Sequence, residues 1–254
     1  MATGLLALMT GRATRLAQYF GESDKTYVAE VTFGMVSDTY DAEGVIVETG
    51  VSPPSDFAVV QRVLDGFRGN FLQTPPAVSA KKVHGVAAYK LTRKQIPVDL
   101  KPVEVNIKRL EAESLAPGKI VLVVTCSTGT YVRSIAHDLG QRLGCGALLS
   151  KLRRIQSGEF TIQQARTLDE FAELAAAGRL HEAVIPPARL LPRFPAEHFD
   201  SFFEAQIRQG RDFRTSPFVV PPGAQFVKAL SHSGELIAIG ELIIPNLYHP
   251  VTVL

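Results

Sequence analysis

Residues 120–160, IVLVVTCSTGTYVRSIAHDLGQRLGCGALLSKLRRIQSGEF, decide the fold of this 254-residue chain. Residues 120–126 are apolar and mostly β-branched, which predicts a strand buried on both faces. Residues 127–130 supply a turn and several hydroxyls that can cap a helix. Apolar residues then recur every four positions from 135 to 143, and Gly144 ends the pattern, so a helix should follow. From residue 149 the sequence returns to β structure.

Arg133 falls in the first turn of this predicted helix. The helix macrodipole is positive there, so a cation is disfavoured by about 0.3–1 kcal/mol. A guanidinium in that position indicates an anionic partner, such as a carboxylate or a phosphate. The alternative is an arginine that simply points into water, and the spacing alone leaves both interpretations open.

The composition limits the class of protein. With 46% hydrophobic residues, the chain can bury one large core, or one core and a small appended domain. No apolar run is long enough to span a bilayer, and we find no secretory leader with a cleavage site. Cys126 and Cys145 show neither metal nor redox spacing, and the six histidines are scattered. We therefore expect a cytoplasmic protein with reduced thiols and without a metal site.

The charge is spread unevenly, although the net charge is only +2. Residues 1–166 carry 20 basic and 15 acidic side chains, whereas residues 167–254 carry 7 and 10. Five basic side chains lie within residues 81–94, a segment that contains no acid. This distribution fits a polyanionic ligand without proving one.

The remaining segments predict a mixture of helices and strands. We expect helices at 11–20, 55–67 and 168–177, with Ser55 capping the second, and strands at 25–34, 45–48 and 102–111. The strand at 102–111 should pair with residues 119–126 across the turn at 117–118. Prolines at 186–195 mark a boundary or linker. Residues 196–254 contain short β-prone runs, which predict a small barrel or sandwich.

Two loops stand out by their composition. Residues 37–44, SDTYDAEG, form an acidic loop in which Asp38 and Asp41 are candidates for Asx turns. Residues 71–90 begin with an extended entry enforced by Pro75 and Pro76 and continue as a basic loop of small residues. Such a loop suits a phosphate-tracking surface, although a solvated loop without a ligand is the alternative.

Several blocks follow one another along the chain: ATGLL with GRATRLAQY, KTY, SDTYDAEG, TPPAVSAKKVHGVAAY, STGTYVRSIAHDLG and LGCGALLSKLRRIQSG. Together these ordered blocks resemble the TruB-type tRNA pseudouridine synthases. Their order and spacing match over residues 1 to about 190, and the tail resembles the PUA-like RNA-binding module of such enzymes. The resemblance implies an α+β fold: a mixed, mainly antiparallel sheet with flanking helices in a catalytic core over 1–190, and a PUA-like module over 196–254.

The resemblance also implies the activity and the residues that carry it. Such enzymes isomerise the T-arm uridine at tRNA position 55 to pseudouridine, with an Asp nucleophile and no metal or organic cofactor. Arg133 matches the arginine that aims this Asp, and Asp41 matches a second carboxylate of the same network. Tyr27 matches the ring that stacks on the flipped base, and Leu152 matches an apolar wall of the pocket. The alternative is that both are core residues, one a strand aromatic and the other a packing leucine. The candidates for contacts to tRNA phosphates are Lys81, Lys82, Arg153 and Arg154.

One departure from the family is large. The catalytic Asp of the family lies in a Gly-His-x-Gly-x-Leu-Asp-Pro-x-Ala-Thr-Gly motif, and this chain begins just before its Ala-Thr-Gly. We therefore expect an N-terminally truncated chain that lacks the nucleophile and is inactive as given.

Two other functions remain open from the sequence. The chain could be a non-catalytic RNA-binding or RNA-remodelling module of the same fold. A small-molecule glycosidase would need two carboxylates flanking a sugar. Asp38 and Asp41 could supply that pair, but the basic loop and the PUA-like tail argue against it.

Overall fold

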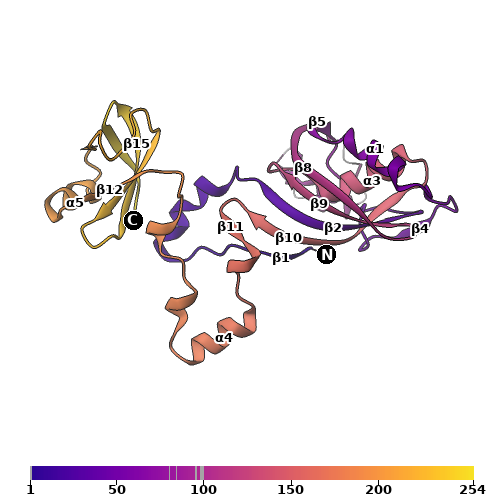
Figure 1. Ribbon diagram of the computed structural model, residues 1–254, viewed down its shortest axis with the longest axis horizontal. Coiled ribbons are helices and arrows are strands. Elements are labelled where there is room, and N and C mark those ends of the chain that lie inside the picture. The colour runs from indigo at the N-terminus through magenta and orange to yellow at the C-terminus, as the bar shows by residue number, and fades with distance from the viewer. Residues whose placement is uncertain (1, 80, 84, 95, 98–99) are drawn as a thin grey trace. The chain divides into compact units, whose positions relative to one another are not determined.

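The computed structural model describes residues 2–79, 81–83, 85–94, 96–97 and 100–254. They form two compact units (Figure 1). The first contains the N-terminal residues up to 6 and residues 22–165, and the second contains residues 7–21 and 166–254.

The first unit is built on a seven-stranded sheet. Six strands lie in the order β1-β10-β2-β9-β8-β5, and β11 pairs with β10. The strands are β1 (Ala2–Gly4), β2 (Lys25–Phe33), β5 (Gly69–Gln73), β8 (Val103–Ala116), β9 (Lys119–Cys126), β10 (Ala147–Ser157) and β11 (Phe160–Thr161). Among the pairings of these described strands, only that of β1 with β10 is parallel. The expected mixed, mainly antiparallel sheet is thus confirmed.

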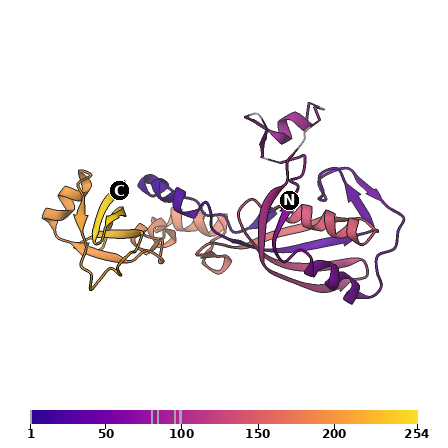
Figure 2. The ribbon, with the colours of Figure 1, turned by 90° about the horizontal axis from the view of Figure 1, so that it is seen from above.

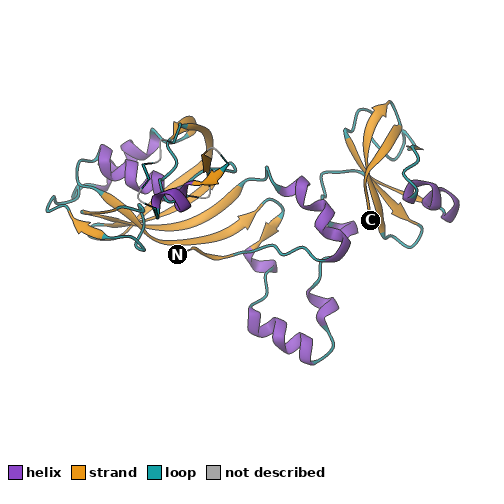
Figure 3. Ribbon diagram, turned by 180° about the vertical axis from the view of Figure 1, so that it is seen from behind, coloured by secondary structure: helices purple, strands orange, loops and turns teal. Residues whose placement is uncertain are grey.

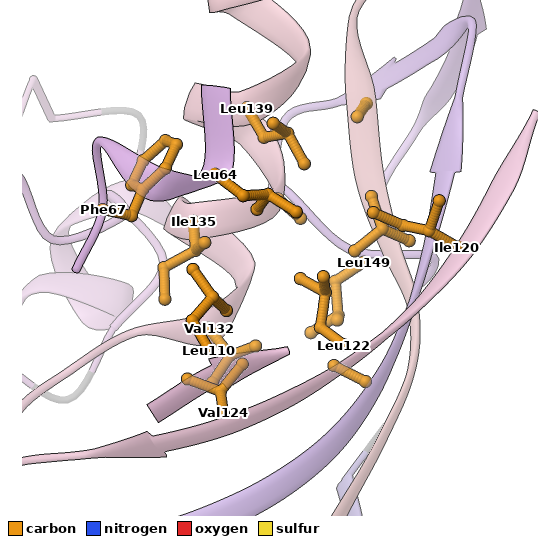
Figure 4. Packing of buried hydrophobic residues seen from close by; sticks show 14 of the residues in the cluster. Leu64, Phe67, Leu110, Ile120, Leu122, Val124, Val132, Ile135, Leu139 and Leu149 are labelled. Carbon is orange, nitrogen blue, oxygen red and sulfur yellow. The ribbon is translucent and has the colours of Figure 1, made fainter. Parts of the chain in front are cut away.

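Two helices, α1 (Phe57–Asp65) and α3 (Val132–Arg142), cover one face of this sheet (Figure 3). Their apolar side chains pack against those of the strands in one core (Figure 4). Ile135 and Leu139 of α3 are fully buried there, together with Leu122 and Val124 of β9. At about 25 cal/mol per Å² of apolar surface removed from water, this burial dominates the stability of the unit.

The central strand β9 differs from the sequence-based expectation. Its residues alternate between buried and half-buried positions, so the prediction of a strand buried on both faces is wrong. The buried positions, such as Leu122, face α3, and the alternate positions face away from it. Because the helices cover one face, half of the apolar run is enough to complete the core.

The helix caps also differ from the expected ones. Helix α3 begins after Tyr131, whose side chain makes no cap. The Ser127 hydroxyl, a candidate cap, instead accepts a hydrogen bond from the backbone N of Asn106 at 2.9 Å. Helix α1 is capped by Asp56, whose carboxylate accepts from Ala58 N at 2.8 Å, and not by Ser55. A carboxylate at this position satisfies an end N–H and also interacts favourably with the macrodipole.

Smaller elements complete the first unit. They are the hairpin of β3 (Met35–Ser37) with β4 (Ile46–Glu48), the hairpin of β6 (Lys82–Val83) with β7 (Val86–Ala87), the helix α2 (Ala88–Thr92) and the 3₁₀ turn η2 (Ile162–Gln164). The segment of β6, β7 and α2 projects away from the sheet of its unit (Figure 2).

The second unit contains a single five-stranded sheet in the order β12-β14-β15-β16-β13, where the sequence predicted a small β-barrel or sandwich. Its strands are β12 (Ala196–Phe199), β13 (Phe213–Arg214), β14 (Phe226–Ser231), β15 (Leu236–Ile244) and β16 (Leu247–Val253). Its helices are α4 (Leu168–Ala176) and α5 (Ser201–Arg208), with the 3₁₀ helices η1 (Gly11–Phe20), η3 (Leu180–Ala183) and η4 (Pro187–Arg189). The predicted helix at 11–20 is therefore of the 3₁₀ type, and Leu16 is its buried residue.

Candidate functional site

Arg133 lies at the centre of a hydrogen-bonded network in the first unit. Its Nη1 donates to Asp41 Oδ2 at 3.1 Å and to the carbonyl of Thr39 at 3.4 Å, and its Nη2 donates to the carbonyl of Val78. The side chains of Arg133 and Asp41 are only 20% and 14% exposed. The interpretation of an arginine pointing into water is therefore excluded. The anionic partner expected from the helix position is a carboxylate.

Asp41 is held as tightly as its partner. Its Oδ1 accepts from the Thr39 hydroxyl at 2.6 Å and from Glu43 N at 3.1 Å, the second of which closes an Asx turn. Burial alone would raise the pKa of the Asp41 carboxyl. The hydrogen bonds from Thr39 and Glu43, with the charge of Arg133, outweigh burial and hold this pKa below its usual value. Asp41 is thus both a turn former and an ion-pair partner, ionised at neutral pH.

The acidic loop is fixed against strand β10. Leu149 N donates to Tyr40 O at 3.0 Å, and Ala42 N donates to Leu149 O at 3.0 Å, so Asp41 forms an isolated parallel bridge with Leu149. The other carboxylate of the loop, Asp38, accepts from Val45 N at 2.8 Å. The two carboxylates therefore serve separate hydrogen bonds, and this geometry does not favour a glycosidase pair.

Gln73 fixes the start of α3 and was missed by the sequence analysis. Its buried amide accepts from Tyr131 N at 2.8 Å and donates to Tyr131 O at 3.1 Å. One turn on, the Ser134 hydroxyl donates to Thr74 O at 3.2 Å. Both contacts place the backbone on either side of Arg133. The signal that could have found Gln73 is an amide at the end of a predicted extended segment, two residues before Pro75.

Tyr27 and Leu152 lie on the face of the sheet that α3 covers. Both pack against the core that includes α3, and Leu152 stands opposite Ala29 in the register of β10 with β2. Burial raises the pKa of the Tyr27 phenol, and the neighbouring Arg154 opposes this only in part. Burial likewise raises the pKa of the Cys126 thiol to about 11, so both groups stay protonated at neutral pH.

The four basic candidates do not form one surface. Lys81 and Lys82 are exposed, and their segment is tied to the network because Arg133 donates to the carbonyl of Val78. Arg153 and Arg154 are neighbours on β10, so their side chains point to opposite faces of the sheet. Arg154 faces Tyr27, and its Nε donates to Leu5 O at 2.8 Å.

The structure adds two aromatic residues that the sequence analysis did not single out. The ring of Tyr40 stacks on that of His137, with centroids 3.8 Å apart and planes at 13°. His137 follows Arg133 by one turn of α3, so both side chains face the acidic loop. The helical spacing of Arg133 and His137 could have indicated His137, whereas nothing in the loop sequence indicates that Tyr40 would meet it.

Two further properties concern the described part of the chain. No group of three or more His, Cys, Asp and Glu side chains there could hold a metal ion. None of its helices combines the length and the hydropathy that a membrane-spanning helix requires.

Two solved structures have a fold similar to that of this chain. A Cbf5–Nop10–Gar1 complex matches with a TM-score of 0.67 at 20% identity, covering 96% of this chain and 68% of the matched one. An H/ACA RNP bound to a substrate RNA containing 2′-deoxyuridine matches with a TM-score of 0.64 at 19% identity, covering 96% and 69%.

Comparison of sequences defines the family. The family model of the TruB family pseudouridylate synthase N-terminal domain matches residues 1–132, and that of the tRNA pseudouridylate synthase B C-terminal domain matches residues 133–191. The tRNA pseudouridine synthase B of Solibacter usitatus is 49% identical over 254 residues, which are 100% of this chain and 87% of the relative. That of Aquifex aeolicus is 39% identical over 83% of this chain and 73% of its own length. The chain belongs to the TruB family of pseudouridylate synthases.

Proposed function

We propose that this protein is a tRNA pseudouridine synthase that acts on the T-arm uridine at tRNA position 55. Family membership supports the reaction type, and the names of the relatives support tRNA as the substrate. The observation that carries the site assignment is the buried Arg133–Asp41 ion pair, because both residues lie in segments that match the family motifs.

The proposed reaction breaks the N1–C1′ glycosidic bond, turns the bound uracil and joins its C5 to C1′. The target base must first leave its stack, at a cost of a few kcal/mol. Tyr27 would stack on the flipped base, a contact worth about 1–3 kcal/mol, and Leu152 would form an apolar wall. In this proposal Arg133 holds the nucleophilic Asp ionised and oriented, and Asp41 in turn fixes Arg133.

The role of Arg133 follows from its available geometry. A planar guanidinium can bridge several acceptors at fixed angles, which an ammonium cannot. Arg133 already joins the acidic loop, through Asp41 and Thr39, to the basic segment, through Val78. In this proposal the Arg133 guanidinium therefore fixes the positions of a carboxylate, the flipped base and the basic segment relative to one another.

The nucleophile itself is not assigned to any residue of this chain. The family's Gly-His-x-Gly-x-Leu-Asp-Pro sequence does not occur within residues 1–254. We therefore expect the chain by itself to bind T-arm RNA without converting uridine. The same observation favours a second function, that of a non-catalytic RNA-binding or RNA-remodelling module.

Turnover on T-arm RNA distinguishes the two functions. Release of tritium from a stem-loop labelled at uridine C5 would be measured for this chain and for a form extended at the N-terminus by a segment carrying the family motif. The synthase predicts no release by the chain alone and release by the extended form. In the extended form, Arg133→Ala should lower kcat on the order of 10²-fold or more, with a much smaller rise in KM. Turnover by the chain alone would show that the nucleophile is misassigned, and an inactive extended form would favour the binding module.

The domain organisation belongs to the same proposal. We propose a catalytic core over residues 1–190 and a PUA-like RNA-binding module over residues 196–254. The five-stranded sheet β12–β16 lies within the proposed module and has a buried core of its own. A tRNA substrate would also place the protein in the cytoplasm.

A further inference from the structure

Tyr40 adopts a backbone conformation that its side chain disfavours. Its φ is +65°, in the left-handed region where a residue with a Cβ is disfavoured by roughly 1–2 kcal/mol. Tyr40 directly precedes Asp41, so the direction in which the chain leaves Tyr40 decides where the Asp41 carboxylate lies. Some interaction has to offset the disfavoured conformation.

The ring of His137 supplies that interaction. The two rings are stacked at 3.8 Å with an interplanar angle of 13°. A stacked aromatic pair contributes about 0.5–1.5 kcal/mol beyond the area it buries, which is of the same size as the backbone penalty. The main chain of Tyr40 adds hydrogen bonds to Ser37 O and from Leu149 N, at 3.2 and 3.0 Å.

His137 acts here as a flat ring and not as a charge. Its Nδ1 is buried and has no hydrogen-bond partner among the described residues. Burial lowers the pKa of His137, and the adjacent Asp138 opposes this only in part, so the ring is neutral at pH 7. Since Nδ1 makes no hydrogen bond in the described part of the chain, the stack on Tyr40 is the contact by which His137 meets the acidic loop.

Arg133 and His137 therefore approach the acidic loop from successive turns of one helix. Arg133 binds the Asp41 carboxylate, and His137 holds the residue before it. We propose that His137 is a positioning residue, which fixes Tyr40 in the left-handed conformation and thereby holds Asp41 on Arg133. Its relevance to pseudouridine formation rests on the proposed function, whereas the positioning itself is a property of the ligand-free protein.

The test measures the pKa of Asp41 in the ligand-free 254-residue chain, by NMR of its ¹³C-labelled carboxyl carbon. The unsubstituted chain should titrate below the usual Asp range. In His137→Ala the pKa of Asp41 should rise toward its ordinary value, because the carboxylate loses its fixed contacts. The conservative variant His137→Phe keeps a stacking ring and should leave the pKa of Asp41 low.

Substitution of Tyr40 gives a second, independent arm. Tyr40→Ala removes the stack but keeps the backbone penalty, so the pKa of Asp41 should rise. Tyr40→Gly removes both, because glycine adopts positive φ readily, and should leave that pKa low. In the Tyr40→Gly background, His137→Ala should then have no further effect. This pair of variants serves also if His137→Ala fails to fold.

The proposal is overturned if His137→Ala lowers the melting temperature but leaves the pKa of Asp41 unchanged, since His137 would then only fill space. Equal pKa values of Asp41 in Tyr40→Ala and Tyr40→Gly would overturn it as well. Neither result depends on RNA, so a failure here is distinct from a failure of the turnover assay.

Discussion

Arg133 stands where a helix disfavours a cation, and this makes its partner informative. The cost of about 0.3–1 kcal/mol near the helix start is smaller than the gain of a charge-assisted hydrogen bond to a largely buried carboxylate, about 1.5–3 kcal/mol. The ion pair with Asp41 at 3.1 Å therefore outweighs the unfavourable dipole. Each partner would be left as an uncompensated, largely buried charge without the other, which is why the two should be treated as one unit.

His137 should make the stability of the protein depend on pH. Burial lowers its pKa in the folded state below the value of about 6.5 that it has in the unfolded chain. Around that pH the unfolded state binds more protons, so stability falls as the pH is lowered through about 6.5. His137→Phe removes this contribution. We expect the melting temperature to drop less between pH 7.5 and 5.5 in the variant than in the unsubstituted chain. Equal drops would show that His137 does not titrate across this range.

The secondary elements show how far the sequence determines the fold. The strand at 119–126 and the helix that follows it were predictable, because an apolar run and a four-residue repeat are local signals. The face of β9 that is buried was not predictable from the sequence, because it depends on where α3 packs. The hydroxyl cap expected before α3 does not form, and Gln73, 58 residues away, accepts the hydrogen bond of the Tyr131 backbone N there. Arg133 could be singled out from its place in the helix, whereas the stack of Tyr40 on His137 joins residues whose sequence separation hides their contact.

The close approach of α3 to β10 gives a prediction at Gly140. A Cβ on this residue would overlap the backbone of Gly146 and Ala147. Alanine is favoured over glycine within a helix by about 1 kcal/mol, but overpacking against an unyielding backbone costs about 1–3 kcal/mol. Gly140→Ala should therefore lower the free energy of unfolding, measured by urea denaturation. The exposed neighbour Gln141→Ala is the control and should leave it within about 0.5 kcal/mol. A stabilised Gly140→Ala would mean that the helix can move away from the strand.

The charge of neither unit as a whole identifies the proposed RNA contact, because the first unit carries 17 basic and 15 acidic side chains and the second carries 10 of each. The clearest charge signal is local: residues 81–94 carry five basic side chains and no acidic one. Lys81 and Lys82 are both exposed, on a segment that the Val78 carbonyl connects to Arg133. We therefore propose that these lysines attract a polyanion bound at the proposed site, by a long-range interaction that salt screens.

Substitution of both lysines tests this placement. Lys81→Glu with Lys82→Glu should weaken binding of a T-arm stem-loop, measured by fluorescence anisotropy across a salt series. Each phosphate contact that is lost should reduce the slope of log Kobs against log salt by about 0.7–0.9. Arg62→Glu with Lys119→Glu changes the net charge equally, at exposed positions on α1 and β9. If net charge alone determined the affinity for RNA, both double variants would bind the stem-loop equally weakly. A larger reduction of the salt slope in Lys81→Glu with Lys82→Glu would locate phosphate contacts at these two lysines. An unchanged affinity in that double variant would remove them from the interface.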